Sequence, residues 1–324
     1  MREFKKPNLI LSICLEFCKC RYNGEVIRDD FIKKLSEYTN FIKVCPEVEI
    51  GLGVPRNAVR LIKENDQFKL LDSKTGENHT DKMKGFAADF IDSLNSEEIE
   101  GFIAKNRSPS CGSGDSKVYS DIGRVPALGE KVSGMFTSMI VENLPMVLIE
   151  NEGRLKNFKL RENFLIQIFM LSDLREVIKL GKISKLIEFH SNNKYLIMSY
   201  NQKKLNELGS IIASYKKGDF AEIASEYRTK LIEAVKTVPG TGRRINMLQH
   251  IFGYVSKNIS ARERQYFLNS LEDYREERIP FSLPLALLRS WVIRFEVDYL
   301  LAQTIFYPYP ENLIEVNDSG KGRI

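Results

Sequence analysis

The stretch LILSICLEF, residues 9–17, decides the fold of the first half of the chain. Its apolar start, together with Asn8, predicts a buried β-strand, and Cys14 follows where the chain should turn. Two later segments repeat this arrangement: FIKVCPEVEIGLG (41–53) leads to Cys45, and GFIAKNRSPSCGSG (101–114) leads to Cys111. The first half therefore contains three apolar segments that are each followed by a cysteine.

Helix-like segments separate these predicted strands, and alternation of this kind predicts a parallel α/β sheet. The second half reads almost wholly helical, and its most apolar helix is expected over 283–306. We predict an α/β parallel-sheet domain over residues 1–152, followed by an all-α domain over residues 153–324. The sequence segments behind this prediction are helices at 28–41, 82–94, 133–145 and 160–180, and further strands at 67–80 and 146–150.

The three cysteines are expected to meet in space, because the carboxyl ends of parallel strands share one edge of the sheet. Three thiolates can bind three irons of a 4Fe–4S cube and leave the fourth iron for a non-protein ligand. Two alternatives stay open: buried cysteines can be simple small hydrophobes, and a structural zinc site would use the same thiols. Cys18 and Cys20 match no zinc-ribbon or standard ferredoxin spacing; they are interpreted as bystanders, with the alternative that one of them lies near the cluster.

Bulk composition excludes several classes of protein. The chain has 324 residues, 43% hydrophobic and 28% charged, which is typical of a globular protein. No uncharged apolar run approaches the roughly 18 residues of a membrane helix. The apolar N-terminal stretch is interrupted by Glu16 and lacks a small-residue cleavage site, so we expect a cytoplasmic protein with reduced thiols.

The two halves differ in charge. Residues 1–150 carry 21 Lys and Arg against 23 Asp and Glu, whereas residues 151–324 carry 27 against 20. This mild basic excess leaves nucleic-acid contact by the helical half open, with a solvated Lys-rich surface as the alternative. Arg243 and Arg244 in PGTGRRIN could contact RNA or a phosphate, although a solvated turn explains them more simply. No sequence feature indicates the oligomeric state.

The cysteine segments resemble a known family. SICLEFCKCRYNG (12–24), VCPEVEIGLGVPR (44–56) and KNRSPSCG (105–112) are similar to the three signature blocks of the thiouracil desulfidase (TudS) family. The second half resembles the helical YbgA-type domain that is fused to it in many members. The segments that carry this second resemblance are NEGRLKNFKLRENF (151–164), FHSNNKYLIMSYNQ (189–202) and DSGKGR (318–323).

The resemblance implies a 4Fe–4S cluster held by three cysteines and the removal of sulfur from thiolated uracil compounds. By motif position the ligands are Cys14, Cys45 and Cys111, with one iron not ligated by protein. The CPE glutamate corresponds to Glu47, implied to take a proton from the water that attacks the thiocarbonyl carbon. The SPSCG serine, which would hydrogen-bond the ring or the bound sulfur, is Ser108 or Ser110.

One departure from the family pattern concerns the first block. Many members carry CLxG there, and this chain has Phe17 in place of the glycine, which can alter the pocket wall. Basic residues in or next to the blocks could receive a nucleotide phosphate, with ordinary surface charge as the alternative. These candidates are Arg21, Arg56, Lys105 and Arg107.

We therefore predict a non-redox desulfidase that acts on a thiolated pyrimidine or its nucleotide and releases hydrosulfide. The alternative, from a different class, is a non-enzymatic iron–sulfur or zinc protein that senses redox state or binds nucleic acid.

Overall fold

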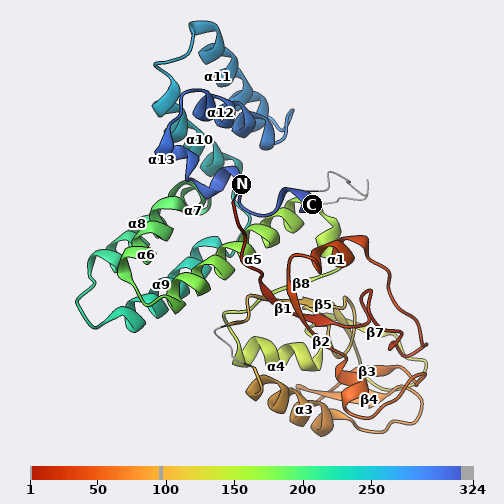
Figure 1. The fold of residues 1–324 in the computed structure, drawn as a ribbon. Coiled ribbons are helices and arrows are strands. Elements are labelled where there is room, and N and C mark those ends of the chain that lie inside the picture. The colour runs from red at the N-terminus through yellow and green to blue at the C-terminus, as the bar shows by residue number, and fades with distance from the viewer. Residues whose placement is uncertain (1, 95–97, 315–324) are drawn as a thin grey trace. The chain divides into compact units, whose positions relative to one another are not determined.

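The structure is a computed structural model that describes residues 2–94 and 98–314 (Figure 1). The segment DSGKGR (318–323), which carries part of the second resemblance, lies outside the described residues. By internal contacts the chain divides into two units. One contains Lys5–Ser172 with the described residues after Glu311, and the other contains Asp173–Glu311 with the described residues before Lys5. The domain boundary expected at residue 153 stays a prediction.

A four-stranded parallel sheet forms the centre of the first unit, as the alternating sequence pattern predicted. Its strand order is β2-β1-β5-β8. Leu9 of β1 pairs with Phe41 of β2 on one side and with Gly101 of β5 on the other. The bounds are β1 (Asn8–Ser12), β2 (Asn40–Val44), β5 (Gly101–Ala104) and β8 (Leu148–Asn151).

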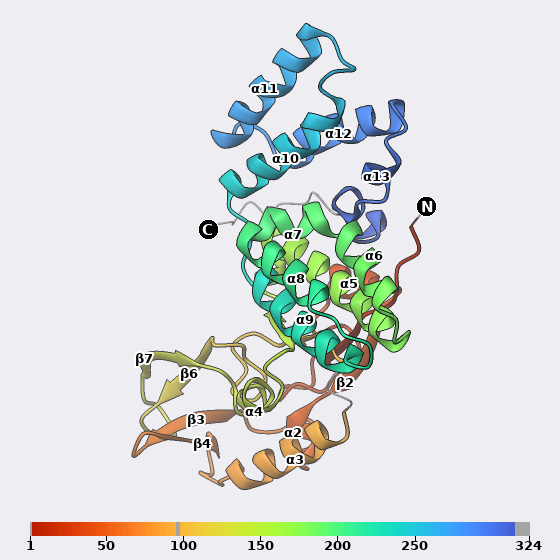
Figure 2. The ribbon, with the colours of Figure 1, turned by 90° about the vertical axis from the view of Figure 1, so that its left-hand side faces the viewer.

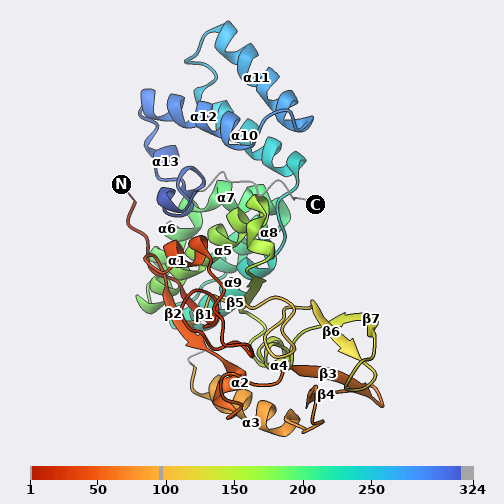
Figure 3. The same cartoon turned by 90° about the vertical axis from the view of Figure 1, so that its right-hand side faces the viewer.

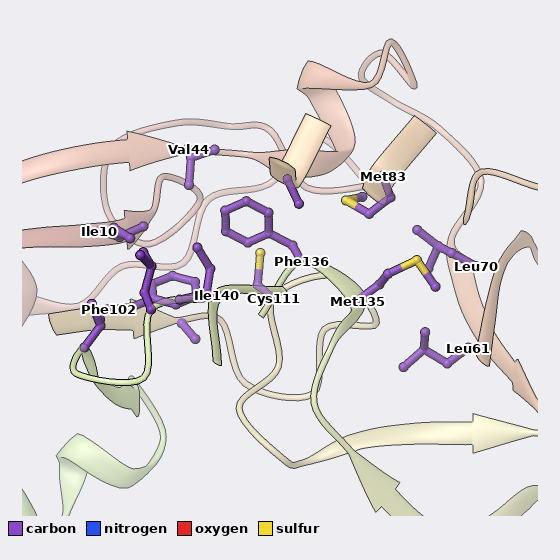
Figure 4. Packing of buried hydrophobic residues seen from close by; sticks show 14 of the residues in the cluster. Ile10, Val44, Leu61, Leu70, Met83, Phe102, Cys111, Met135, Phe136 and Ile140 are labelled. Carbon is purple, nitrogen blue, oxygen red and sulfur yellow. The ribbon is translucent and has the colours of Figure 1, made fainter. Parts of the chain in front are cut away.

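Side chains from this sheet alternate between two buried layers. On one face, Ile10 and Phe102 pack with Phe136 and Ile140 of α4 (Met135–Asn143), close to α3 (Thr80–Asp92) (Figure 4). The Phe102 and Phe136 rings meet edge to face at 6.0 Å. Fully burying one such side chain contributes about 1.5–3 kcal/mol, so this layer anchors the strands from which the site loops emerge.

The other face of the sheet is covered by α1 (Asp30–Leu35) and the first part of α5 (Phe158–Lys179). Phe164 of α5 lies so close to β5 that a β-carbon at Gly101 would be 3.3 Å from its ring. Helix α1 begins because the Asp29 carboxylate accepts the Ile32 N–H at 3.0 Å, a standard N-cap. The helix predicted over 28–41 is therefore shorter, because β2 already starts at Asn40.

A second sheet, which the sequence pattern did not predict as such, has the order β4-β3-β6-β7 and mixed pairing. Strands β3 and β4 form an antiparallel hairpin, β3 and β6 run parallel, and β6 and β7 run antiparallel. The bounds are β3 (Val59–Glu64), β4 (Gln67–Asp72), β6 (Ser116–Tyr119) and β7 (Ala127–Val132). The intervening loop residues 105–115 lead from one sheet to the other.

The second unit is helical, as predicted (Figure 2). Helix α7 packs against α8 and α10, and α10, α11 and α12 lie side by side (Figure 3). Among the described residues no helix has the length and apolar character needed to cross a membrane. The bounds are α6 (Ile183–Asn192), α7 (Lys194–Tyr200), α8 (Gln202–Ala213), α9 (Phe220–Val235), α10 (Thr241–Val255), α11 (Ala261–Arg275), α12 (Ser282–Arg294) and α13 (Asp298–Leu301).

Two sequence expectations about this unit are wrong. The helix expected over 283–306 ends at Arg294, where Glu296 adopts a left-handed φ of 49°. The Val297 and Glu296 N–H groups bond back to Val292 and Ile293, which is a Schellman cap. The second expectation concerned Arg243 and Arg244.

Arg243 and Arg244 do not form a solvated turn, because both lie in the first turns of α10. Arg243 donates to the Tyr200 carbonyl at 2.9 Å. Arg244 is buried and its guanidinium lies 4.4 Å from the centre of the Phe281 ring. These two residues thus hold helices together within the unit.

Candidate functional site

The first site loop leaves the carboxyl end of β1 and carries Cys14. The chain turns at once, because the Leu15 N–H donates to the Ser12 carbonyl at 2.9 Å. Glu16 adopts a left-handed φ of 71°, which is uncommon for a residue other than glycine. Its carboxylate accepts the Asp29 N–H at 2.8 Å, and this bond holds the pKa of Glu16 below its usual range. The bond ties the loop to the start of α1.

Phe17, the departure from the family pattern, points away from the site. Its side chain is 37% exposed, and Lys43 lies 3.9 Å above its ring. The ring also meets Phe41 edge to face at 6.0 Å. Phe17 does not line the cavity described below.

The second site loop is a direct junction between β2 and the short helix α2 (Pro46–Glu49). Cys45 is the N-cap of α2, and Pro46 starts the helix, where its missing N–H costs nothing. The Cys45 thiol lies 3.8 Å from the carbonyl oxygen of Cys20. Glu47 stands in the first turn of the same helix, so one junction positions both a thiol and a carboxylate.

The third site loop follows β5 and carries Cys111. The Ser108 hydroxyl accepts the N–H groups of Ser110 and Cys111 at 3.2 and 3.1 Å, which closes a tight turn. The Cys111 carbonyl accepts the Thr137 hydroxyl at 2.7 Å, which joins the loop to α4. These bonds leave the backbone around Cys111 little freedom.

Two glycines permit this close approach. The Gly134 N–H donates to the Gly112 carbonyl at 2.7 Å. A β-carbon at Gly134 would lie 2.7 Å from the Cys111 nitrogen, and one at Gly112 would lie 2.7 Å from the Ser108 carbonyl oxygen. Real β-carbons do not come this close to backbone atoms, so the loop and the start of α4 need glycine at both positions.

The three loops surround a cavity of about 370 Å³. A water molecule takes about 30 Å³ in the liquid, so the cavity has room for a ligand of many atoms. Every residue predicted from the sequence lines it except Ser110, which contacts the lining residue Glu47. The lining residues are Ser12, Cys14, Cys20, Arg21, Tyr22, Val44, Cys45, Pro46, Glu47, Arg56, Lys105, Asn106, Arg107, Ser108, Pro109 and Cys111.

Three of the cavity thiols, those of Cys20, Cys45 and Cys111, have raised pKa values. A hydrogen bond with the Cys14 thiol raises the pKa of Cys20 to about 12. The pKa of Cys45 is raised by its contact with Cys20 and by burial, and that of Cys111 is raised chiefly by burial. Thiols that cannot ionise next to one another can do so when a cationic group shares them, and protons are then released.

The donor set fits an iron–sulfur cluster, since such clusters are held by cysteine thiolates. Cys14, Cys45 and Cys111 come from three separate loops and face one cavity. Within the described part of the chain, no group of three or more His, Cys, Asp or Glu side chains is arranged around a point that would hold one metal ion.

The Glu47 carboxylate is held by both of its oxygens. Oε1 accepts the Ser110 hydroxyl at 2.9 Å, and Oε2 accepts Arg56 Nε and Nη2 at 2.9 and 2.5 Å. The side chains of Arg56 and Glu47 are 6% and 13% exposed, so this ion pair is largely shielded from water. A carboxylate oxygen can accept two hydrogen bonds, which leaves Glu47 able to bind a water molecule in the cavity.

The four basic candidates differ in their partners. Arg56 is engaged by Glu47, and Lys105 pairs with Glu152 at 2.8 Å. Arg21 makes a longer contact of 3.2 Å with the exposed Glu25. Arg107 is exposed, has a left-handed φ of 56°, and forms no salt bridge with the residues that the structure describes. Arg107 is therefore the basic group at the cavity that is most available to an anion.

The sequence analysis missed Ser12 and left open whether Cys20 belongs to this site. Ser12, the last residue of β1, is 1% exposed, and its hydroxyl accepts the Lys105 N–H at 3.0 Å. A polar residue inside an apolar run was the available signal. Cys20 also lines the cavity, whereas Cys18 does not. Its position next to Arg21 in the first block was the only signal, because no strand precedes it.

The helical unit contains a cavity of its own, about 740 Å³. His190 in its wall lies 3.0 Å, through Nδ1, from the Tyr227 hydroxyl, and burial lowers the pKa of this histidine. None of the residues predicted to be functional lies there. The lining residues are His190, Lys194, Tyr195, Met198, Gln202, Leu205, Asn206, Gly209, Ser210, Ala213, Asn246 and His250.

Two family models match the chain in sequence order. The model described as 2-thiouracil desulfurase matches residues 9–152, which include all three site loops. The model described as a protein of unknown function (DUF1722) matches residues 194–310.

Two similar proteins and one solved structure each match slightly less than half of the chain. The uncharacterized protein YbgA of Escherichia coli (strain K12) is 24% identical over 161 residues, which are 49% of this chain and 95% of YbgA. The uncharacterized protein YbbK of Bacillus subtilis (strain 168) is 30% identical over 151 residues, 44% of this chain and 96% of YbbK. A solved structure of the 4Fe–4S-dependent thiouracil desulfidase TudS is 21% identical, with a TM-score of 0.36 over 46% of this chain and 93% of that one.

Proposed function

Because the chain belongs to the 2-thiouracil desulfurase family and carries a C-terminal domain of the DUF1722 family, we propose that it is a desulfidase acting on a thiolated pyrimidine. The reaction exchanges the thiocarbonyl sulfur for the oxygen of water and releases hydrosulfide. The observation that carries this proposal is the Glu47 carboxylate, fixed through both oxygens at a cavity that is also lined by three cysteines.

Cys14, Cys45 and Cys111 would hold the cofactor, a 4Fe–4S cluster. When bound, the cluster supplies an iron that draws electron density from the substrate's thiocarbonyl carbon through its sulfur. The three thiols come from loops that are fixed by backbone hydrogen bonds, so the protein presents them without a large rearrangement.

Glu47 acts as the general base in this proposal. The remaining lone pair of Oε1 binds a water molecule and takes a proton from it as the oxygen attacks the carbon. The same carboxyl group then returns the proton to the departing sulfur, so that no net proton is left on the protein. Shielding from bulk water strengthens such a proton transfer, because fewer competing water molecules surround the carboxylate.

Ser110 and Arg56 are positioning residues, since each contacts Glu47 and Ser110 does not line the cavity. The Ser108 hydroxyl accepts two backbone N–H groups and lines the cavity. Its own hydrogen is therefore directed away from the turn and can be donated to a substrate ring atom or sulfur.

The substrate is a small molecule, and Arg107 favours one that carries an anionic group. A nucleotide would place its phosphate near the exposed guanidinium at the mouth of the cavity, where charge-assisted hydrogen bonds form. A free base lacks this contact and should bind more weakly. The substrate class is thus a thiolated pyrimidine, with the nucleotide preferred over the base.

Anaerobic purification with iron and sulfide analysis, followed by a substrate screen, tests the proposal. We expect about four irons and four sulfides per chain, and hydrosulfide release from 2-thiouracil, a thiouridine or its monophosphate. The matched control is the same protein after chelator treatment, which should release none. A preparation with one zinc and no iron, or a cluster that releases no hydrosulfide from any of these compounds, would contradict it.

A further inference from the structure

A buried hydroxyl lies beside one of the three predicted ligands. Ser12, the last residue of β1, is 1% exposed and lines the cysteine cavity. Its hydroxyl contacts the Cys111 thiol, which is itself only 6% exposed. The proposed function gives this hydroxyl no task, although it belongs to a different strand from the ligand that it meets.

The direction of this contact follows from the other hydrogen bond of the same hydroxyl. Its oxygen accepts the Lys105 N–H at 3.0 Å, and a serine hydroxyl has one hydrogen of its own to donate. Within residues 2–94 and 98–314, no oxygen atom accepts that hydrogen. Because buried hydroxyl groups keep their hydrogens paired, the Ser12 hydrogen is directed to the Cys111 sulfur.

The electrostatics of Cys111 agree with this direction. Burial raises the pKa of the Cys111 thiol, and the bond with the Ser12 hydroxyl is the strongest influence in the opposite sense. Lowering a thiol pKa is what a donor does when it stabilises the thiolate. Ser12 is therefore already placed to favour the ionised form that a metal-bound cysteine adopts.

Two comparisons mark Ser12 as distinct. The Cys45 sulfur lies 3.8 Å from the Cys20 carbonyl oxygen, a group that can only accept. The Ser108 hydroxyl also contacts the Cys111 thiol, but its oxygen closes the turn on which Cys111 itself lies. Ser12 thus joins the Cys111 sulfur to the strand that leads to another ligand.

We propose that the Ser12 hydroxyl donates a hydrogen bond to the Cys111 thiolate when that thiolate holds the cluster, which makes Ser12 a positioning residue of the site. This inference rests on the proposed function. Hydrogen bonds to cysteine sulfur are one means by which a protein sets the electronic properties of an iron–sulfur cluster. The donor withdraws charge from the sulfur, so the sulfur gives less electron density to iron. An iron that polarises the substrate's thiocarbonyl group is then a stronger electron acceptor.

The cluster's reduction potential reports this bond directly. Reduction adds one negative charge to the cluster, and a donor at the Cys111 thiolate stabilises the reduced form more than the oxidised form. Ser12→Ala should therefore shift the potential to a more negative value. If Ser12 served only to accept the Lys105 N–H, its loss would change iron content or thermal stability and leave the potential unchanged.

The test uses the full-length protein, reconstituted anaerobically with iron and sulfide. In a dithionite titration with redox mediators, the reduced fraction of Ser12→Ala at the wild-type midpoint should be several-fold smaller than that of wild type. Ser12→Thr, which keeps the hydroxyl, should stay close to wild type. Ser113→Ala is the matched control, because the Ser113 hydroxyl lies two residues after Cys111 and does not line the cavity.

Resonance Raman spectra in H2O and D2O provide the second measurement. The iron–cysteine stretching bands of wild type should shift in D2O, because the proposed hydrogen is exchangeable, and the shift should be smaller in Ser12→Ala. Ser12→Gly, which also lacks the hydroxyl, takes its place if Ser12→Ala does not hold a cluster.

The outcomes separate this inference from the proposed function. Equal potentials in wild type and the hydroxyl-free variant overturn the role of Ser12 and leave the desulfidase proposal standing. A wild-type spectrum without the isotopic shift does the same, even where a variant holds no cluster. Wild type that binds no iron would instead refute the proposed function, before Ser12 is tested.

Discussion

Two cavities of this molecule, the cysteine cavity and the cavity of the helical unit, differ in ways that their volumes do not indicate. The cavity of the helical unit, about 740 Å³, is twice as large as the cysteine cavity, about 370 Å³. Its walls are helix faces, whereas the smaller cavity is lined by loops that leave three parallel strands. Only the smaller one combines clustered thiols with a shielded ion pair between Glu47 and Arg56.

This difference shows where fixed charge and reactive groups can be held. Strand ends bring distant residues to one edge, and backbone hydrogen bonds then fix each loop. A gap between packed helices offers space with fewer such constraints. Convergent polar groups therefore locate chemistry better than cavity size does.

The largest effect is expected when a thiol is removed from the cysteine cavity. Cys45→Ala or Cys111→Ala should reduce cluster iron to background, because each removes one of the three proposed thiolate ligands. Iron and sulfide analysis after anaerobic reconstitution measures this. His250→Ala, in the helical cavity, is the control and should retain full iron. A Cys111→Ala protein with wild-type iron would show that the cavity does not hold the cluster through this residue.

A smaller effect is expected at the carboxylate. Glu47→Gln should keep the cluster but lower kcat by roughly 10²–10⁴-fold, the usual contribution of general acid–base catalysis. Visible absorbance and hydrosulfide release measure the two quantities on one sample. Glu49→Gln, an exposed position on the same helix, should be unaffected. Full activity in Glu47→Gln would remove the proposed base.

Two roles for Arg56, as the anchor of Glu47 and as a ligand of a substrate phosphate, predict different kinetics. As the anchor of Glu47, Arg56→Lys should lower kcat by roughly tenfold to a hundredfold, since a lysine keeps the charge but loses the forked contact. As a phosphate ligand, it should instead raise KM for nucleotides only. Comparing a thiouridine monophosphate with 2-thiouracil distinguishes the two. Arg60→Lys, on β3, is the control.

The smallest effect is expected for His190 in the helical cavity, and it concerns the pH dependence of stability. Burial, with the charge of Lys194, lowers the pKa of His190 in the folded protein. The unfolded chain therefore binds a proton at about pH 6.5 that the folded state resists, so stability falls as pH drops through that value. Thermal melting of wild type should show this loss more than His190→Gln. An identical pH dependence in the two proteins would argue against the buried neutral imidazole.

Much of the cysteine site could be predicted, because strand ends in a parallel sheet have known positions. Cys14, Cys45 and Cys111 each follow a strand, and the structure brings them to one cavity as that topology requires. Glu47 was predicted only from the resemblance, as the glutamate of the CPE block. The resemblance of three sequence blocks then suggested the chemistry that these residues share.

Other features depend on tertiary contacts that local patterns do not encode. Cys20 reaches the cavity by a loop that Arg56 anchors from 36 positions along the chain. The sequence predicted Arg56 as a phosphate ligand, and its pairing with a carboxylate follows from the position of Glu47 in the folded chain. Likewise, the end of α12 depends on the left-handed conformation of Glu296, which no proline or glycine announces.

Gly112 and Gly134 are two positions to inspect in homologous chains. Neither residue carries a chemical group, yet a single methyl at either position would collide with the backbone on which Cys111 is displayed. A homologous chain could retain every cysteine and the glutamate, replace one of these glycines, and still be unable to assemble the pocket. Inspecting these two positions would therefore separate chains able to carry out the chemistry from those that have only its visible residues.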